Sequence, residues 1–271
     1  MNEIDRLKNI AKQIRLDIIE EVYSAQSGHP GGALSVTDIL TVLYFHEMNI
    51  NPEKPDMENR DRLVLSKGHA SAALYATLAN RGFFDRENLK TFRKINSNLQ
   101  GHPDKNKVPG VDMTTGSLGQ GLSAANGMAI AGKLNNKDYR VYCILGDGEI
   151  EEGQIWEAAM AAAHYKLDNL CVIVDNNNLQ IDGEISNVMN SYPIDEKFES
   201  FGFEVMNIDG HDIDEIIKAF EVAKNIKGKP VAIIAKTIKG KGVDFMENQA
   251  GWHGKAPNEE QYKQAINYIN K

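Results

Sequence analysis

The sequence has no long apolar run and very little cysteine. No stretch approaches the roughly 18 consecutive apolar residues of a membrane-spanning helix, and the N-terminus is charged, unlike a secretory signal. We therefore expect no membrane segment, and a cytoplasmic location is the default. The two cysteines, Cys143 and Cys171, lie inside apolar segments. Such cysteines are usually small buried hydrophobic residues, which favours a reducing compartment over a disulfide or a metal site.

Basic residues are fewer than acidic ones. The 271 residues include 30 Lys and Arg against 38 Asp and Glu, which gives a net charge of -8. This balance argues against nucleic acid and anionic membrane surfaces as partners. Repeats, low-complexity tracts and linker-like segments are also lacking. Because 42% of the residues are hydrophobic, enough for a buried core, we expect residues 1–271 to form a single domain.

The apolar residues form alternating helix-like and strand-like segments. From Ile4 to Val22 they are spaced by three and four residues, which predicts a long opening helix. A second helix is expected from about Ser35 to Glu47, with Ser35 or Thr37 as its cap. Further helices are expected at about 72–78, 118–134, 152–163 and 213–224, and strands at 62–66, 139–145, 169–174, 203–207 and 231–235. Continuous apolar strands separated by helices predict an α/β fold, with a parallel sheet flanked by helices on both faces.

Polar clusters follow two of these strands. Gly146-Asp147-Gly148-Glu149 closes one, and Asp175-Asn-Asn-Asn178 closes the other. Each cluster alone is typical of an ordinary turn. Parallel strands end side by side, however, so a carboxylate about 30 residues before a carboxamide can share a hard cation and the diphosphate that it carries. Asp147, Asn177 and the carbonyl of Leu179 can supply oxygen ligands to Mg²⁺, with Ca²⁺ or Mn²⁺ as alternatives. The helix expected after Glu152 would point its N-terminus at the anion.

Histidine beside glycine is the second recurring pattern. It occurs at His29, His69, His102 and His253. Glycine keeps the neighbouring backbone slim where a ligand must approach, and neutral imidazoles can exchange protons with hydroxyl groups near pH 7. These four histidines therefore suit a polyhydroxylated substrate. The histidines without this context are expected to be structural: His46, His164 and His211.

A set of short segments spanning nearly the whole chain resembles transketolase segments in the same order. They are Ser27–Gly31, Gly68–Ala70, Gly101–Pro103, Thr114–Gly121, Gly146–Gly153, Asp175–Gly183, Lys239–Gly242 and Trp252–Gly254. The resemblance implies a thiamine diphosphate-binding domain of the diphosphate type, in which Asp147, Asn177 and Leu179 hold the metal. It also implies a set of residues that border the cofactor: His69, Gly116, Ser117, Leu118, Asp147, Gly148, Asn177 and His253.

The same resemblance implies the residues that meet the sugar. His29, His102 and His253 would border it, and His69 would lie near its first hydroxyl group. Ser117 stands where many members of the family have proline, which leaves a backbone contact with the cofactor in place. The implied reaction transfers a two-carbon ketol group from a ketose phosphate to an aldose phosphate. In it, His29 and His253 would accept and return a hydroxyl proton.

Two domains of a full-length transketolase have no counterpart in this sequence. The pyrimidine-binding domain, which supplies a glutamate to the cofactor, and the C-terminal domain would follow His253, but the chain stops about 18 residues later. We therefore expect them on a partner chain, with this chain as the separately encoded N-terminal subunit of an α2β2 heterotetramer. The acidic charge fits this division, because the arginines that bind the sugar phosphate come largely from the missing half in the family.

Two other functions remain open. The metal-binding subunit of a 2-oxo acid dehydrogenase shares the Gly-Asp-Gly and Asn features, although decarboxylation of a 2-oxo acid does not require so many hydroxyl-directed histidines. A non-catalytic thiamine diphosphate-binding module is the other alternative, since the chain carries only half of an active site. The residues that select the ketose and the aldose are expected mostly on the partner.

Overall fold

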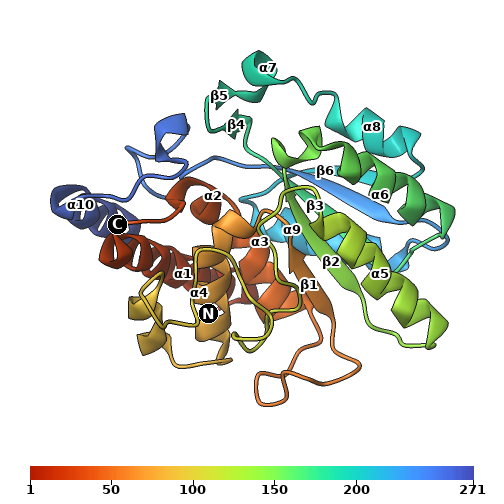
Figure 1. The fold of residues 1–271 in the computed structure, drawn as a ribbon, viewed down its shortest axis with the longest axis horizontal. Helices are drawn as coiled ribbons and strands as arrows, with labels where there is room; N and C mark the ends of the chain where they lie inside the picture. Colours follow the sequence, from red (N-terminus) through yellow and green to blue (C-terminus); the bar gives the residue numbers. More distant parts are fainter.

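The computed structural model describes Met1–Lys271 and is built on a five-stranded parallel sheet (Figure 1). Its strands run in the order β1-β2-β3-β7-β6, and every neighbouring pair is parallel. The strands are β1 (Arg62–Leu65), β2 (Val141–Gly146), β3 (Leu170–Asn176), β6 (Glu204–Asp209) and β7 (Val231–Lys236). The central strands are buried along almost their full length, as expected for parallel strands covered on both faces.

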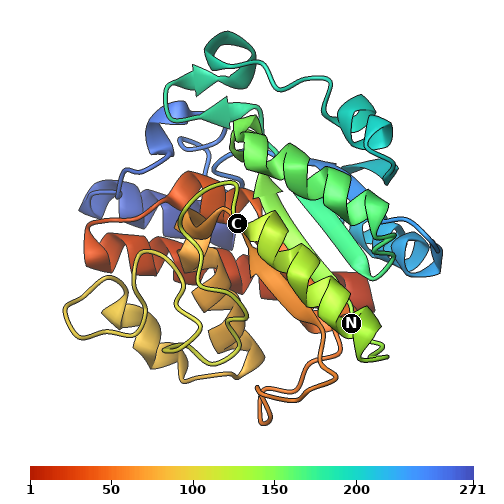
Figure 2. The ribbon, with the colours of Figure 1, turned by 45° about the vertical axis from the view of Figure 1, so that its right-hand side comes forward.

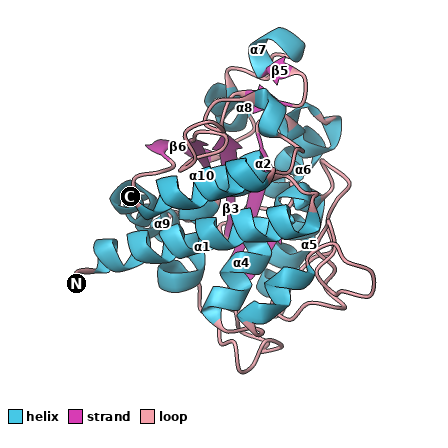
Figure 3. Ribbon diagram, turned by 90° about the vertical axis from the view of Figure 1, so that its left-hand side faces the viewer, coloured by secondary structure: helices cyan, strands magenta, loops and turns pink.

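Helices cover both faces of the sheet, which confirms the predicted α/β fold. Along β2, Tyr142 and Ile144 point to one face, and Cys143 and Leu145 point to the other. The first face is covered by α1 (Glu3–Ala25), α3 (Thr37–Val42), α4 (Ser71–Arg81) and α9 (Ile213–Asn225). Helix α10 (Glu259–Asn270) packs alongside α1 in this layer (Figure 3). The second is covered by α5 (Gly121–Leu134), α6 (Gly153–His164) and α8 (Ile194–Ser200) (Figure 2).

The two cysteines are buried and free, as predicted. They belong to neighbouring strands, but Cys143 packs on the face covered by α5 and α6, whereas Cys171 packs on the opposite face. The sheet therefore separates the two thiols. None of the helices combines the length and the apolar composition that crossing a membrane requires.

The second helix differs from its prediction. In place of one helix over 35–47, the chain forms α2 (Pro30–Ser35), then α3, and then a final π-helical turn, Leu43–Glu47. Pro30 is the first residue of α2, a position that suits its fixed φ angle. Neither predicted cap acts as one: the Ser35 hydroxyl donates to Asp175, and the Thr37 hydroxyl donates to the carbonyl of Ala33.

Other boundaries also shift. Helix α5 begins at Gly121, three residues after its predicted start, so residues 114–120 remain a loop. The sequence patterns missed the short β4–β5 hairpin (Leu179–Gln180 and Gly183–Glu184), α7 (Ile185–Val188), α8 and α10. The hairpin and α7 project beyond the sheet at the top of Figure 1. Single turns of 3₁₀-helix occur at Gly68–Ala70, Glu149–Glu151 and Ala250–Trp252, and a longer one at Arg86–Thr91.

Candidate functional site

A cavity of about 280 Å³ lies at the carboxyl edge of the sheet. All of the site residues predicted from the sequence line it, except Ser117: His29, His69, His102, Gly116, Leu118, Asp147, Gly148, Asn177, Leu179 and His253. Ser117 is exposed and does not line the cavity. The structure thus brings residues from the whole length of the chain to one site.

Asp147 is buried in the cavity wall, with 2% of its surface exposed. Its carboxylate accepts hydrogen bonds from the backbone N–H groups of Gly148 and Asn178, and it forms no ion pair. Burial, followed by repulsion from Asp175, raises the pKa of Asp147 to about 7. A bound cation would compensate this buried carboxylate.

Asn177 and Leu179 complete a set of three oxygen donors. The side-chain Oδ1 of Asn177 accepts from the backbone N–H of Leu179 at 3.1 Å. The carbonyl of Leu179 accepts from Lys239 Nζ at 2.9 Å, which leaves its second lone pair available. A carboxylate, an amide oxygen and a backbone carbonyl are ligands that suit Mg²⁺ or Ca²⁺. Since no group of three His, Cys, Asp or Glu side chains is arranged to hold a metal ion, a metal here would rely on these mixed oxygens.

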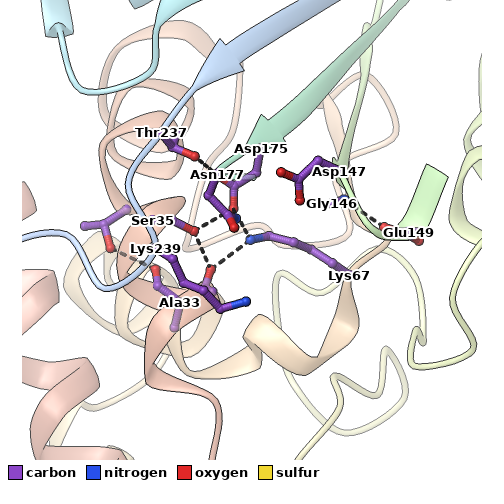
Figure 4. Close-up of polar contacts among 12 residues, drawn as sticks. Ala33, Ser35, Lys67, Gly146, Asp147, Glu149, Asp175, Asn177, Thr237 and Lys239 are labelled. Carbon is purple, nitrogen blue, oxygen red and sulfur yellow. Dashed lines mark hydrogen bonds and ion pairs between the residues drawn. The ribbon is translucent and has the colours of Figure 1, made fainter. Parts of the chain in front are cut away.

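Lys67 and Asp175 form a buried ion pair beside these donors (Figure 4). Asp175 is fully buried and also accepts hydrogen bonds from the hydroxyls of Ser35 and Thr237. Burial alone would raise the pKa of Asp175, but Lys67 and the hydroxyl donors hold it below its usual value. Asp175 begins one of the motifs found in the sequence and Lys67 directly precedes another, but nothing in the sequence pairs them.

Glu149 joins three loops of the cavity. Its carboxylate accepts from the hydroxyl of Ser66 after β1, and from the backbone N–H groups of Gly119 and Gly146 at 3.0 Å each. Burial raises the pKa of Glu149 in spite of these donors. The cavity wall here is the turn Gly146–Glu149. The start of α6 does not line it, contrary to the expectation that this helix would face an anion.

Three imidazole rings face one another across the cavity. The ring centroids of His29 and His69 are 5.3 Å apart, those of His29 and His253 are 5.4 Å apart, and those of His69 and His253 are 5.2 Å apart. His102 approaches from the loop side and packs on Gly116, where a Cβ atom would lie 3.0 Å from its ring. Gly116 has a φ of 151°, so this position needs glycine both for space and for conformation.

Burial keeps these imidazoles neutral. It lowers the pKa of His29 to about 4, with help from Arg93, His102 and Lys239. Burial and the nearby Lys239 lower the pKa of His253 to about 3. The pKa of His69 is also well below its usual value, because of burial and Lys67. The cavity therefore presents uncharged rings that can form hydrogen bonds with hydroxyl groups at neutral pH.

Lys239 connects the metal-donor side of the cavity to the histidine side. Its Nζ lies 3.0 Å from Nδ1 of His253 as well as 2.9 Å from the carbonyl of Leu179. Burial and repulsion from Lys67 lower the pKa of Lys239 to about 8. The sequence contained one signal for it, the Lys239–Gly242 segment, to which we had assigned no role.

The remaining histidines lie outside the cavity, in agreement with a structural role. His211 is the clearest case: its Nδ1 is 2.7 Å from Asp38, and its Nε2 accepts from the backbone N–H of Ile238 at 2.8 Å. This pairing holds the loop that leads to Lys239.

Comparison with known proteins gives consistent matches over nearly the whole chain. Residues 6–268 match the family described as "Transketolase, thiamine diphosphate binding domain". The chain is 46% identical to the 6-deoxy-6-sulfo-D-fructose transketolase subunit SqwG of a Clostridium species, over 98% of this chain and 96% of that protein. It is 43% identical to one subunit of the apulose-4-phosphate transketolase of Phocaeicola vulgatus, over 99% and 95% of the two chains.

A solved structure shows the same relationship. The transketolase of Campylobacter jejuni superposes on all of this chain with a TM-score of 0.93 and 42% identity, but the match covers only 43% of that longer protein.

Proposed function

Because the chain belongs to the transketolase family, as its thiamine diphosphate-binding domain, we propose that it is the N-terminal subunit of a split transketolase. Such an enzyme transfers a two-carbon ketol group from a ketose phosphate to an aldose phosphate. The observation that carries this proposal is the cavity itself. It combines three oxygen donors for a diphosphate-bound cation with a group of neutral histidines for a polyhydroxylated substrate.

The residues of the metal side fit a divalent cation. In this proposal, Asp147, Asn177 and the carbonyl of Leu179 would hold Mg²⁺, which would help to neutralise the diphosphate of the cofactor. The fit is supported by the buried carboxylate of Asp147, which has no cationic partner within the chain. Gly148 keeps the backbone slim at the same wall. Lys67 and Lys239 add positive charge beside an anionic ligand.

The cofactor, when bound, supplies the electron sink for carbon–carbon cleavage. The protein residues position the reactants and exchange hydrogen bonds with them. We propose that His69, Gly116, Ser117, Leu118 and the wall at Gly148 border the cofactor. His29, His102 and His253 would hold the hydroxyl groups of the sugar. Their lowered pKa values favour neutral rings over imidazolium ions there.

The second half of the active site would come from a partner chain. The two relatives described above are named as subunits, and this chain spans less than half of the full-length Campylobacter enzyme. We propose that the partner carries the pyrimidine-binding and C-terminal domains, and that two copies of each chain assemble as α2β2. We also propose a cytoplasmic location, in keeping with two free buried cysteines. Residues 1–271 would then form one diphosphate-binding domain.

The comparisons support this function over a role in a 2-oxo acid dehydrogenase and over a non-catalytic module. According to their names, the two relatives act on different sugars, 6-deoxy-6-sulfo-D-fructose and apulose 4-phosphate. The substrate of this chain must therefore be determined by experiment. The assembled enzyme would be given a panel of ketose phosphates and sulfonated ketoses, and separately pyruvate. We expect two-carbon transfer from one of the ketoses. Pyruvate decarboxylation without transfer from any ketose would refute the proposal.

A further inference from the structure

Arg93 contacts one nitrogen of the His29 ring, the Nδ1 atom. Arg93 Nη2 is 3.3 Å from His29 Nδ1, and Nη1 donates to the hydroxyl of Ser27 at 3.2 Å. A guanidinium group has donors only, so Nδ1 of His29 must accept this hydrogen bond. The proton of the neutral ring then resides on Nε2. The Cδ2–Nε2 edge lies beside Gly254, where a Cβ atom would be 3.5 Å away.

The conformation of its loop fixes the position of Arg93. Its backbone has a φ of 57°, which is uncommon for a residue with a side chain, and its N–H donates to the carbonyl of Leu99 at 2.8 Å. Gly101 leaves room for the guanidinium group, since a Cβ atom there would lie 2.8 Å from Cζ. The side chain also lies over the ring of Phe92, 5.5 Å from its centroid. The loop thus directs Arg93 toward Ser27 and His29.

The charged and titratable groups around His29 all disfavour a second proton on its ring. Arg93 and His102 approach from the loop after α4, and Lys239 approaches from the loop after β7. The rings of His69 and His253 complete the surroundings. Burial and these groups lower the pKa of His29 to about 4. His253 has a similar arrangement, because its Nδ1 faces Lys239.

We propose that Arg93 is a positioning residue that fixes His29 as the Nε2–H tautomer, so that His29 donates a hydrogen bond to a substrate oxygen instead of accepting its proton. This role rests on the proposed function and revises the proton-accepting role that the family resemblance implied for His29. A ring held in this way stabilises negative charge that develops on the sugar oxygen, because its N–H donor is oriented in advance.

The tautomer can be read directly from the isotope-labelled full chain. Long-range ¹H–¹⁵N spectra near pH 7.5 distinguish a protonated ring nitrogen from an unprotonated one, and the signals of His29 are assigned by their loss in His29→Gln. We expect Nδ1 of His29 to be unprotonated and Nε2 to carry the proton. A protonated Nδ1 in the wild-type chain would overturn the proposal whether or not any variant folds.

Variants separate the role of Arg93 from simple packing. Arg93→Met should raise the pKa of His29 by about one unit or more, because it removes a cation and its hydrogen bond. Arg93→Lys should keep the wild-type value, and Lys94→Met, the same change at the exposed neighbouring cation, is the matched control. Equal pKa values of His29 in Arg93→Met and Lys94→Met would contradict the proposal.

Activity gives the final comparison. In the enzyme assembled with its partner, Arg93→Met should lower kcat roughly five- to tenfold, with unchanged affinity for thiamine diphosphate, and Arg93→Lys should restore most of it. If the assembled enzyme transfers no two-carbon unit while the spectra still show the Nε2–H tautomer, the proposed function fails and the role of Arg93 stands. Full kcat in Arg93→Met would overturn that role instead.

Discussion

Several charged side chains of the cavity wall are buried, and a buried charge is unfavourable unless a partner of opposite charge lies beside it. Lys67 and Asp175 neutralise each other, but Asp147 has only backbone N–H donors. A carboxylate of this kind is costly in the isolated chain and becomes favourable once a cation is bound. The proposed metal role of Asp147 follows from this difference.

Removal of this charge should weaken cofactor binding. In the complex with the partner chain, Asp147→Asn should lower the Mg²⁺-dependent affinity for thiamine diphosphate by more than the roughly 10- to 100-fold typical of changes outside the ligand shell. Isothermal titration calorimetry measures this affinity. Asp138→Asn is the control, because Asp138 is exposed just before the opposite end of β2. Equal affinities in the two variants would rule out the metal assignment.

Glu21 is another buried carboxyl group, and the sequence predicted no role for it. It lies in α1 with 0% exposure, and neither carboxylate oxygen has a hydrogen-bond partner. Burial, followed by Asp17 and Glu20, raises the pKa of Glu21 well above its usual value. The folded chain therefore favours the protonated form of this group. Its contribution to stability is lost as pH rises above the unfolded pKa of about 4.3 toward the raised folded pKa.

The raised pKa of Glu21 predicts that the effect of Glu21→Gln on stability depends on pH. Glu21→Gln removes the proton equilibrium, so its free energy of unfolding relative to wild type should increase between pH 5 and pH 8, by about 1 to 3 kcal/mol. Urea unfolding at three pH values measures the difference. Glu20→Gln, at the half-buried neighbouring position, should show a much smaller pH dependence. A constant difference between Glu21→Gln and wild type across this range would show that Glu21 is ionised in the fold.

Residue types and glycine neighbours indicated much of the site from the sequence alone. His29, Asp147 and Asn177 were recognisable because each belongs to a motif at a strand end or beside glycine. Arg93 had no such signal, since its contact with His29 depends on a loop whose path only the structure reveals. The pairing of Lys67 with Asp175 was hidden for the same reason: the two residues are 108 positions apart.

Whole elements meet at Asp175. Its carboxylate accepts hydrogen bonds from Ser35 of α2, from Lys67 in the loop after β1, and from Thr237 in the loop after β7. The ends of one helix and three strands are therefore fixed relative to one another at the cavity. Substitution of Asp175 should therefore loosen the contacts among all four elements.

Loss of this carboxylate should destabilise the fold strongly. Asp175→Ala leaves Lys67 buried without a counter-charge, and we expect the free energy of unfolding to fall by about 3 to 5 kcal/mol in urea unfolding. The double variant Lys67→Met with Asp175→Leu should recover much of this loss, because no charge remains unpaired. Glu259→Ala, which removes an exposed ion pair with Lys263, should have a far smaller effect, because solvent screens exposed pairs. A similarly small effect of Asp175→Ala would contradict this account.

Elements with long apolar patterns were predictable, and short ones were not. Strands β2, β3 and β7 stood out because they are apolar on both faces, which parallel strands between two helical layers require. The two-residue strands β4 and β5 carry too little pattern for any periodicity. Helix α10 did have a signal that we overlooked: Asn258 and Gln261 form a capping box at its start.

At the scale of the whole molecule, the central claim is that this chain supplies one half of a transketolase active site. The family match and the relatives named as subunits support it, and the cavity brings together oxygen donors, two lysines and the predicted histidines. The net charge of -8 is compatible with a partner that provides the arginines for the sugar phosphate. Activity should therefore require assembly of this chain with its partner.

The most direct test is a two-carbon transfer assay on the purified chain before and after addition of the proposed partner chain, with thiamine diphosphate and Mg²⁺ present throughout. We expect no appreciable transfer by either chain alone, and activity that rises with the partner until the two chains are equimolar. Substantial turnover of a ketose phosphate and an aldose phosphate by this chain alone would contradict the claim that half of the active site lies elsewhere.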